Sequence, residues 1–224
     1  MYKRGFYLTL AGLFALSIVV KSQAEDVRSY FGITAGYSLI TGSFNGSDFF
    51  QTDDHIVLVP KIKPSFGMGG VIGIGTNKFD LNIGYFITRS DYTSMDEGYA
   101  GKCTTHLIRF LGFTAYLNKY AESTVRPYFD VDLSIATSVF DKIAYSPSNI
   151  ENPLRAKYGG IIIGMGAGIL IKMSDKLALD IRVLPEYYIG SSIRVKGYKF
   201  YNIEKFGNFL LQSTVGIKYY FKGI

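Results

Sequence analysis

Apolar side chains recur at every second position over most of this chain, and this periodicity limits the fold more than any other feature. The clearest runs occupy residues 31–39, 65–74, 79–88, 129–136, 161–171, 177–183 and 208–221. In one of them, Ile161, Ile163 and Met165 alternate with Gly164 and Gly166. A period of two places successive side chains on opposite faces of a β-strand. The sequence therefore predicts an all-β chain with seven clear strands.

An eighth segment, at 105–117, is strand-like in composition but alternates poorly. Arg109 has the same parity as Leu111 and Phe113, so a regular strand would turn a cation and two bulky apolar side chains to one face. A β-bulge, which adds one residue to a strand, would separate them. Sequence alone leaves the facing of this segment open.

The connections between the eight segments are alternately long and short. The long ones span 40–63, 90–103, 140–157 and 189–205, and the short ones lie at 76–78, 118–124 and 174–176. This alternation is typical of an up-and-down barrel whose two chain ends lie on the side of the short turns. We therefore expect residues 25–224 to form one domain, an eight-stranded antiparallel up-and-down transmembrane β-barrel.

Residues 1–24 have the pattern of a cleaved secretory signal peptide. Lys3 and Arg4 precede an apolar stretch, 5–20, that is short for a membrane-spanning helix. Ser22 and Ala24 are small residues at the −3 and −1 positions of a cleavage site, so we expect the exported chain to begin at Glu25.

Loss of the leader lowers the net charge from +6 to +3, because the leader contains three lysines and arginines and no acid. The basic character of the chain is thus partly a property of the leader. It gives little reason to expect nucleic acid as a partner.

The face opposite the apolar one is rich in glycine, and this separates a membrane barrel from a soluble one. A lipocalin-like carrier alternates too, with its apolar face turned inward and charged side chains toward water. Glycine is costly on an exposed strand but suits a narrow eight-stranded lumen, where small residues make room for large ones. The glycines on this face are Gly32, Gly36, Gly67, Gly69, Gly73, Gly84, Gly164, Gly166, Gly168 and Gly216. We therefore expect the apolar face to contact lipid, with a soluble carrier as a minor alternative.

Ionisable side chains also occur on the predicted inward face. They are Asp80, Asp130, Asp132, Asp180, Arg182, Glu186 and Lys218, with Arg109 as a further candidate. Buried charges must be paired, so the favoured interpretation is a lumenal polar network that fills the barrel. The alternative is a narrow ion path, for which eight strands leave little room.

The last strand resembles the C-terminal assembly signal of bacterial outer-membrane proteins. That signal has a polar residue, a glycine two residues on, and two aromatic residues, and Thr214, Gly216, Tyr219 and Phe221 fill these positions. In the family the final aromatic residue normally ends the chain, whereas residues 222–224 follow it here.

A second likeness lies at residues 126–128, where Arg-Pro-Tyr opens a strand after a short turn. This segment is similar to the outer-membrane β-barrel domain of the OmpA/OmpX-like type. The resemblance is diffuse but covers most of the exported chain. It implies a location in the bacterial outer membrane and insertion by the outer-membrane assembly machinery, and it implies no specific function.

Neither a catalytic site, a metal site nor a cofactor is expected. His55 and His106 are the only histidines, and neither is followed two residues later by the serine that a barrel-type lipid deacylase would need. Cys103 is the only cysteine, so the chain cannot form an internal disulfide. We expect it to be an unpaired thiol in a connection.

The connection at 189–205 is basic. Its charged residues are Arg194, Lys196, Lys199 and Lys205, against Glu204. If both chain ends are periplasmic, this connection lies outside the cell beside the phosphates of lipopolysaccharide, where it would bind them or host surface molecules. The alternative is a merely solvated loop. The sequence thus predicts a non-catalytic barrel with a structural or surface-interaction role, and a narrow channel is the main alternative.

Overall fold

The computed structural model describes residues 27–44, 46, 49–51, 56–94, 99–117, 123–146, 149–195, 198–200 and 207–222. The predicted leader, 1–24, lies outside them. The long strands are β1 (Arg28–Gly42), β5 (Ser65–Gly75), β6 (Phe79–Ser94), β7 (Tyr99–Tyr116), β8 (Val125–Ser146), β9 (Asn149–Lys172), β10 (Leu177–Val195) and β12 (Gly207–Tyr220). The short strands are β2 (Phe49–Gln51), β3 (Ile56–Leu58), β4 (Lys61–Ile62) and β11 (Tyr198–Phe200). In this described part of the chain no helix has the length and apolar character to cross a membrane.

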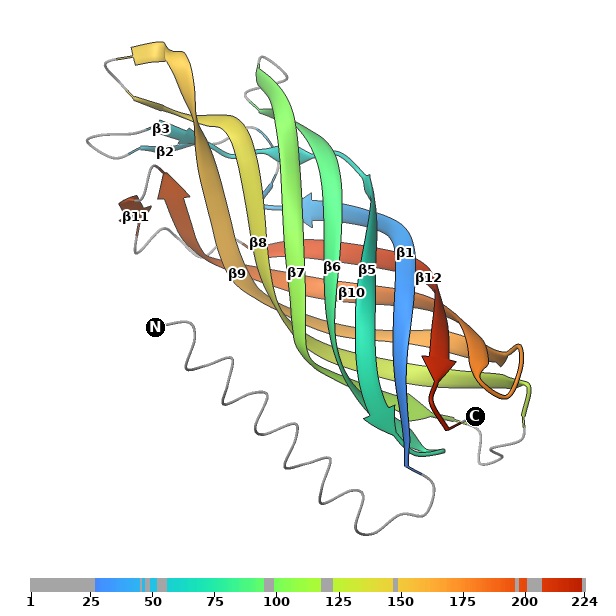
Figure 1. Ribbon diagram of the computed structural model, residues 1–224. Coiled ribbons are helices and arrows are strands. Elements are labelled where there is room, and N and C mark those ends of the chain that lie inside the picture. The colour runs from blue at the N-terminus through green and yellow to red at the C-terminus, as the bar shows by residue number, and fades with distance from the viewer. Residues whose placement is uncertain are drawn as a thin grey trace.

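The eight long strands close into an antiparallel barrel (Figure 1). Each pairs with its neighbours in chain order, and β1 completes the ring by pairing with β12 from Tyr30↔Tyr220 to Gly42↔Asn208. The prediction of an eight-stranded up-and-down barrel is therefore confirmed.

The two ends of the barrel differ. Tight turns join β5 to β6 and β9 to β10 at what we call the turn end, where Thr76 N donates to Phe79 O at 2.8 Å and Met173 N donates to Leu177 O at 2.9 Å. Strand β1 begins and β12 finishes at this same end, at the lower right of Figure 1. The opposite end, which we call the hairpin end, holds the longer excursions of the chain.

The strands reach much further into the hairpin end than the sequence predicts. Within the loops expected at 90–103, 140–157 and 189–205, the described residues 90–94, 99–103, 140–146, 149–157 and 189–195 are strand, so the prediction of loops is wrong for them. Pairing continues to Ser94↔Tyr99, Ser146↔Asn149 and Val195↔Tyr198.

Strand β7 contains the bulge that its poor alternation required. Its register against β8 shifts between Arg109 and Leu111. The shift turns Arg109 into the barrel and leaves Leu111 and Phe113 exposed on the outside. The facing that the sequence left open is thus decided by one extra residue.

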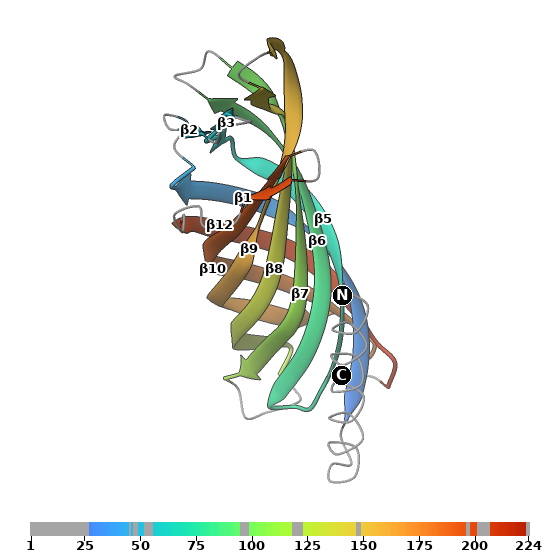
Figure 2. The same cartoon turned by 90° about the vertical axis from the view of Figure 1, so that its left-hand side faces the viewer.

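The connection between β1 and β5 folds back against the barrel at its hairpin end. Strand β3 pairs with β8 through Ile56↔Tyr145 and Val57↔Ala144. Strand β4 pairs with β6, where Ile62 faces Tyr92. Figure 2 shows β2 and β3 at this end of the barrel.

Candidate functional site

The outer surface of the barrel wall is apolar. Ile33, Phe129 and Met165 have 64%, 56% and 67% of their surfaces exposed. Aromatic residues gather at the turn end, where the Phe31 ring lies 5.7 Å from that of Tyr219 and 6.1 Å from that of Phe221. So many large apolar side chains turned outward around a closed barrel require lipid as the surrounding solvent. This excludes the soluble carrier, whose outer face would be polar.

The apolar belt ends part-way along each strand. On β9, Ile161 and Ile163 face outward, but nearer the hairpin end Ala156 and Tyr158 are buried inside while Lys157 is exposed outside. Strand β9 has 24 residues, and a tilted strand needs only about 9–11 to cross a bilayer. The apolar face of the strand therefore changes from the outer to the inner one, because the solvent outside the wall changes from lipid to water. The hairpin end stands clear of the membrane.

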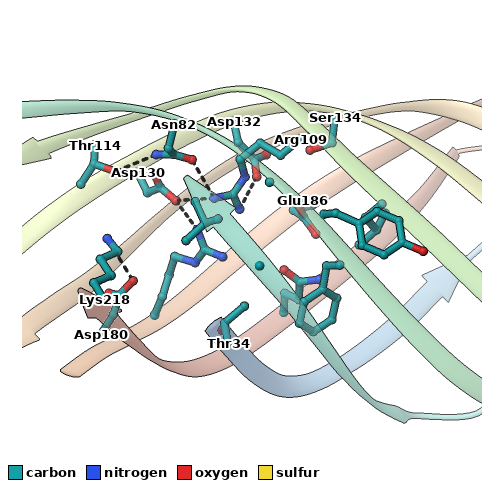
Figure 3. Close-up of a pocket in the computed structure, with 18 of the residues that line it drawn as sticks. Thr34, Asn82, Arg109, Thr114, Asp130, Asp132, Ser134, Asp180, Glu186 and Lys218 are labelled. Carbon is teal, nitrogen blue, oxygen red and sulfur yellow. Dashed lines mark hydrogen bonds and ion pairs between the residues drawn. The ribbon is translucent and has the colours of Figure 1, made fainter. Parts of the chain in front are cut away.

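A charge cluster fills the middle of the lumen. Arg109 Nη2 lies 2.7 Å from Asp132 Oδ2, and its Nη1 lies 3.8 Å from Asp130 Oδ2. From β10, two strands further round the wall from β8, Arg182 Nη1 donates to the same Asp130 oxygen at 2.8 Å. Figure 3 shows Arg109, Asp130 and Asp132 of this cluster close together inside the barrel. Asp130 thus forms ion pairs with two arginines at once, and its carboxylate is almost fully buried.

Neutral groups complete this cluster. Thr114 Oγ1 donates to Asp130 Oδ1 at 2.9 Å, and Asn82 Oδ1 accepts from Arg109 Nη1 at 3.3 Å. Asn82 Nδ2 in turn donates to Thr114 Oγ1 at 3.5 Å. A buried ion pair is stable only when further hydrogen bonds satisfy its remaining polar atoms. Asn82 of β6 and Thr114 of β7 supply such bonds to Arg109 and Asp130, whereas Arg182 Nε and Asp132 Oδ1 have no hydrogen-bond partner among the described residues.

A layer of aromatic rings lies inside the barrel toward the turn end. Lys218 Nζ lies 3.2 Å from Asp180 Oδ2 and 4.9 Å from the centre of the Tyr30 ring. Tyr128 OH donates to Asp180 Oδ1, and the Tyr30 and Tyr220 rings lie 5.2 Å apart. The ammonium group is therefore held by both a carboxylate and aromatic faces.

An apolar layer lies inside the barrel toward the hairpin end. Phe44, from the connection after β1, packs its ring 5.6 Å from that of Tyr158 and 6.2 Å from that of Phe140. The backbone N–H of Phe44 donates to Asn208 Oδ1 at 2.8 Å, and Tyr158 OH donates to Leu58 O at 2.9 Å. The connection thus acts as a cap whose apolar side chains enter the barrel mouth.

Between these layers a cavity of about 50 Å³ remains. It is lined by the charge cluster and by Glu186, which is 3% exposed and whose Oε2 accepts no hydrogen bond from the residues that the structure describes. The cavity has room for roughly a few water molecules, which would hydrate this carboxylate.

Comparisons with known proteins address the fold. No protein-family model and no curated protein matches the sequence. Among solved structures, the chain is similar to the Neisserial surface protein A, NspA, with a TM-score of 0.56 and 12% identity over 85% of this chain and 96% of that one. The chain has the fold of a small bacterial outer-membrane β-barrel.

Two further outer-membrane barrels are also similar. OprG from Pseudomonas aeruginosa gives a TM-score of 0.49 and 14% identity, over 88% of this chain and 95% of that one. Ail of Yersinia pestis was solved with the heparin analogue sucrose octasulfate. It gives a TM-score of 0.48 and 14% identity, over 88% of this chain and 99% of that one. The apolar belt and the fold shared with NspA are those of a barrel that spans a bacterial outer membrane.

The structure brings together inside the barrel the acids and bases that the sequence assigned to the lumen. Asp80 is one of them, and it accepts a hydrogen bond from Tyr116 OH. One lumenal cation was missed. Arg126 is 3% exposed, stacks over the Tyr116 ring at 3.9 Å and donates to Asn77 O. The sequence did contain a signal for this position. Arg126 has the same even parity as Tyr128 and Asp130, which face inward on β8.

The other predicted sites are distributed along the barrel wall. In the suggested assembly signal, Thr214 points into the lumen, whereas Tyr219 and Phe221 are outside at the turn end. Its recognition by the assembly machinery stays a prediction. Of the basic connection, Arg194 is exposed on β10 and Lys199 belongs to β11, while Lys196 and Lys205 lie outside the described residues.

His106 lies on the outer face of β7, where its Nδ1 is 2.6 Å from Tyr85 OH. His55 is outside the described residues. Within the part of the chain that the structure describes, no group of three or more histidine, cysteine, aspartate or glutamate side chains is arranged to hold a metal ion.

Cys103 is buried, and its assignment to a loop is wrong. It lies on β7, beyond the apolar belt, with 1% of its surface exposed and its Sγ 3.7 Å from Thr105 Oγ1. Burial raises the pKa of the thiol to about 12.

We expect a water-soluble maleimide to leave Cys103 unmodified in the folded barrel at pH 7.5 and to label it fully after boiling in SDS, as read by mass spectrometry. Rapid labelling of the folded protein would contradict this position.

Proposed function

We propose that this outer-membrane barrel is closed to solutes, has no catalytic activity, and works through its outer surface as a structural or surface-interaction protein. The observation that carries the proposal is the filled lumen. Aromatic rings, paired charges and an apolar cap follow one another from the turn end to the hairpin end. A barrel sealed in this way has only its rim and outer hairpins available for interaction.

The expected partners follow from the orientation of the barrel in the membrane. Short turns of such barrels face the periplasm and long excursions face outward, so the hairpin end would meet lipopolysaccharide and host surface molecules. The strands protruding at this end bear exposed cations, such as Lys102, Arg155 and Lys157. Insertion would depend on the outer-membrane assembly machinery, for which the aromatic end of β12 is the suggested signal.

Conductance measurements test the closed lumen. We expect the purified barrel in a planar lipid bilayer to give no stable conductance at physiological salt, because the charge cluster and the cap block the lumen in series. The same preparation should run faster on an SDS gel unheated than boiled, which demonstrates that folded barrels were present. A reproducible steady channel, abolished by changing Arg182 or Asp180, would overturn the proposal in favour of a narrow channel.

A further inference from the structure

Two carboxylates face each other across a glycine on the inner wall of the barrel. Asp132 of β8 and Glu186 of β10 are both cross-strand partners of Gly164, which lies between them on β9. A methyl group at Gly164 would lie 2.5 Å from Asp132 Oδ1 and 2.9 Å from Glu186 Cγ. No side chain of β9 therefore separates the two acids, and both line the lumenal cavity (Figure 3).

Each of these carboxylates has an oxygen without a hydrogen bond. Arg109 Nη2 lies 2.7 Å from Asp132 Oδ2, but Asp132 Oδ1 has no hydrogen-bond partner among the described residues. The same is true of Glu186 Oε2, and the two residues are only 2% and 3% exposed. A buried polar atom without a partner costs stability, and a buried charge without one costs far more. A further positive group would therefore be bound most strongly at these two oxygens.

The cavity walls carry one more negative charge than positive. Their acids are Asp130, Asp132, Asp180 and Glu186, and their bases are Arg109, Arg182 and Lys218. Ion pairs join the first three acids to the three bases, and Glu186 takes part in none of them. Ile163 and Tyr187 on the outer wall place this cavity at the height of the apolar belt, where bulk salt screens a buried charge only weakly. One added positive charge would balance the cavity.

The geometry favours a small monovalent cation as that charge. In the described part of the chain no third acid, histidine or cysteine completes a group arranged for a metal ion, and a divalent ion would exceed the single surplus charge. Carboxylate oxygens and water are the ligands of hard cations. The cavity of about 50 Å³ adjoins both carboxylates and has space for a small ion with some of its water. A proton shared by the two acids would need no such space.

We propose that Asp132 Oδ1 and Glu186 Oε2 bind a small monovalent cation such as sodium, with water in the cavity completing its coordination. The ion would connect β8 to β10 across Gly164, as the Arg182–Asp130 ion pair connects the same two strands. The proposal does not depend on which end of the barrel faces outward. It adds a bound ion to a lumen whose protein groups alone leave one acid uncompensated.

The test measures urea unfolding of the exported chain in lipid vesicles, in sodium chloride and in N-methylglucamine chloride at equal ionic strength. N-methylglucamine supplies the same charge on a bulky organic ammonium group, which carboxylates cannot coordinate as they do a metal ion. A ligand that binds only the folded state lowers the equilibrium constant of unfolding. We expect this constant to be about tenfold lower in sodium when its concentration is about ten times the dissociation constant.

Glu186→Gln should fold and should unfold equally in the two salts, because it removes the surplus charge and one of the two ligands. The matched control is Asp80→Asn. Asp80 is also 3% exposed in the lumen but is not among the residues that line the cavity, so this variant should keep the sodium effect. Gly164→Ala is a second test that changes no charge, since its methyl group would occupy the position between the two acids. It should lose the sodium effect too.

Equal unfolding of the wild-type barrel in the two salts would overturn the proposal in favour of a shared proton. Persistence of the sodium effect in Glu186→Gln, or its loss in Asp80→Asn, would place the ion elsewhere and overturn the site. Heat-modifiability on SDS gels shows which variants are folded. If Glu186→Gln is not, Gly164→Ala decides, and an undiminished sodium effect in that variant would exclude the site.

Discussion

Replacing Asp130 by asparagine is expected to lower the free energy of unfolding by about 3–5 kcal/mol, the usual cost of removing one partner from a buried ion pair. The carboxylate of Asp130 lies 2.8 Å from Arg182 Nη1 and 3.8 Å from Arg109 Nη1, so its loss leaves two guanidinium groups undercompensated in the lumen. The chain contains no tryptophan. Urea unfolding in lipid vesicles is therefore followed by the gel mobility of the folded form and by far-ultraviolet circular dichroism.

Asp175→Asn is the matched control. Asp175 also forms an ion pair, with Lys172 Nζ at 3.1 Å, but its side chain is 92% exposed at the turn end. Exposed pairs contribute little, so the midpoint of unfolding should hardly move. The double variant Asp130→Asn/Arg182→Gln should lose less than the sum of the two single losses, because the groups interact directly. Equal effects of Asp130→Asn and Asp175→Asn would contradict the buried network.

Gly73→Ala should lower the free energy of unfolding by about 1–3 kcal/mol, as overpacking of a core usually does. A methyl group at Gly73 would lie 2.4 Å from Cζ of Tyr30 and 2.5 Å from its hydroxyl oxygen. The ring cannot move aside freely, since it is 2% exposed and packs against Tyr220 and the Lys218 ammonium group. The expected result is a lower urea midpoint in the same vesicle assay.

Gly70→Ala provides the control within the same strand. Gly70 has the outward parity of β5, and a methyl group there would meet only Gly32 O at 3.6 Å, an ordinary contact. Its unfolding midpoint should stay at the wild-type value or rise slightly. If both alanine variants were equally stable, the lumen would be less tightly packed around Tyr30 than the structure indicates.

The membrane-spanning part of the fold was predictable because its determinants are local. In a strand the side chains alternate with a period of two, so Ile161, Ile163 and Met165 must share a face whatever surrounds them. Glycine on the opposite face then indicated a narrow lumen. The inward facing of Asp130, Asp132 and Asp180 followed from the same parity.

Arg109 required non-local information. Its parity groups it with Leu111 and Phe113, and only the bulge between Arg109 and Leu111 separates a lumenal cation from a lipid-facing pair. The bulge is favoured by the carboxylates of Asp130 and Asp132 on the neighbouring strand. A partner contributed by another strand cannot be identified from a window of sequence around residue 109.

The hairpin end was mistaken for loops for a related reason. At residues 156–163 the apolar positions pass from even to odd parity, since Ala156 and Tyr158 face inward and Ile161 and Ile163 outward. If apolar side chains are taken to face outward along the whole chain, this reversal of parity resembles the end of a strand. It is a continuous strand that leaves lipid for water, with its inner face covered by Phe44 and β3 from a distant connection. The sequence by itself determined the eight long strands and the facing of seven of them in the bilayer, because these depend on a local period. The bulge, the cap and the pairing of charges in the lumen were decided only by the tertiary structure, because each depends on which distant residues the closed barrel brings together.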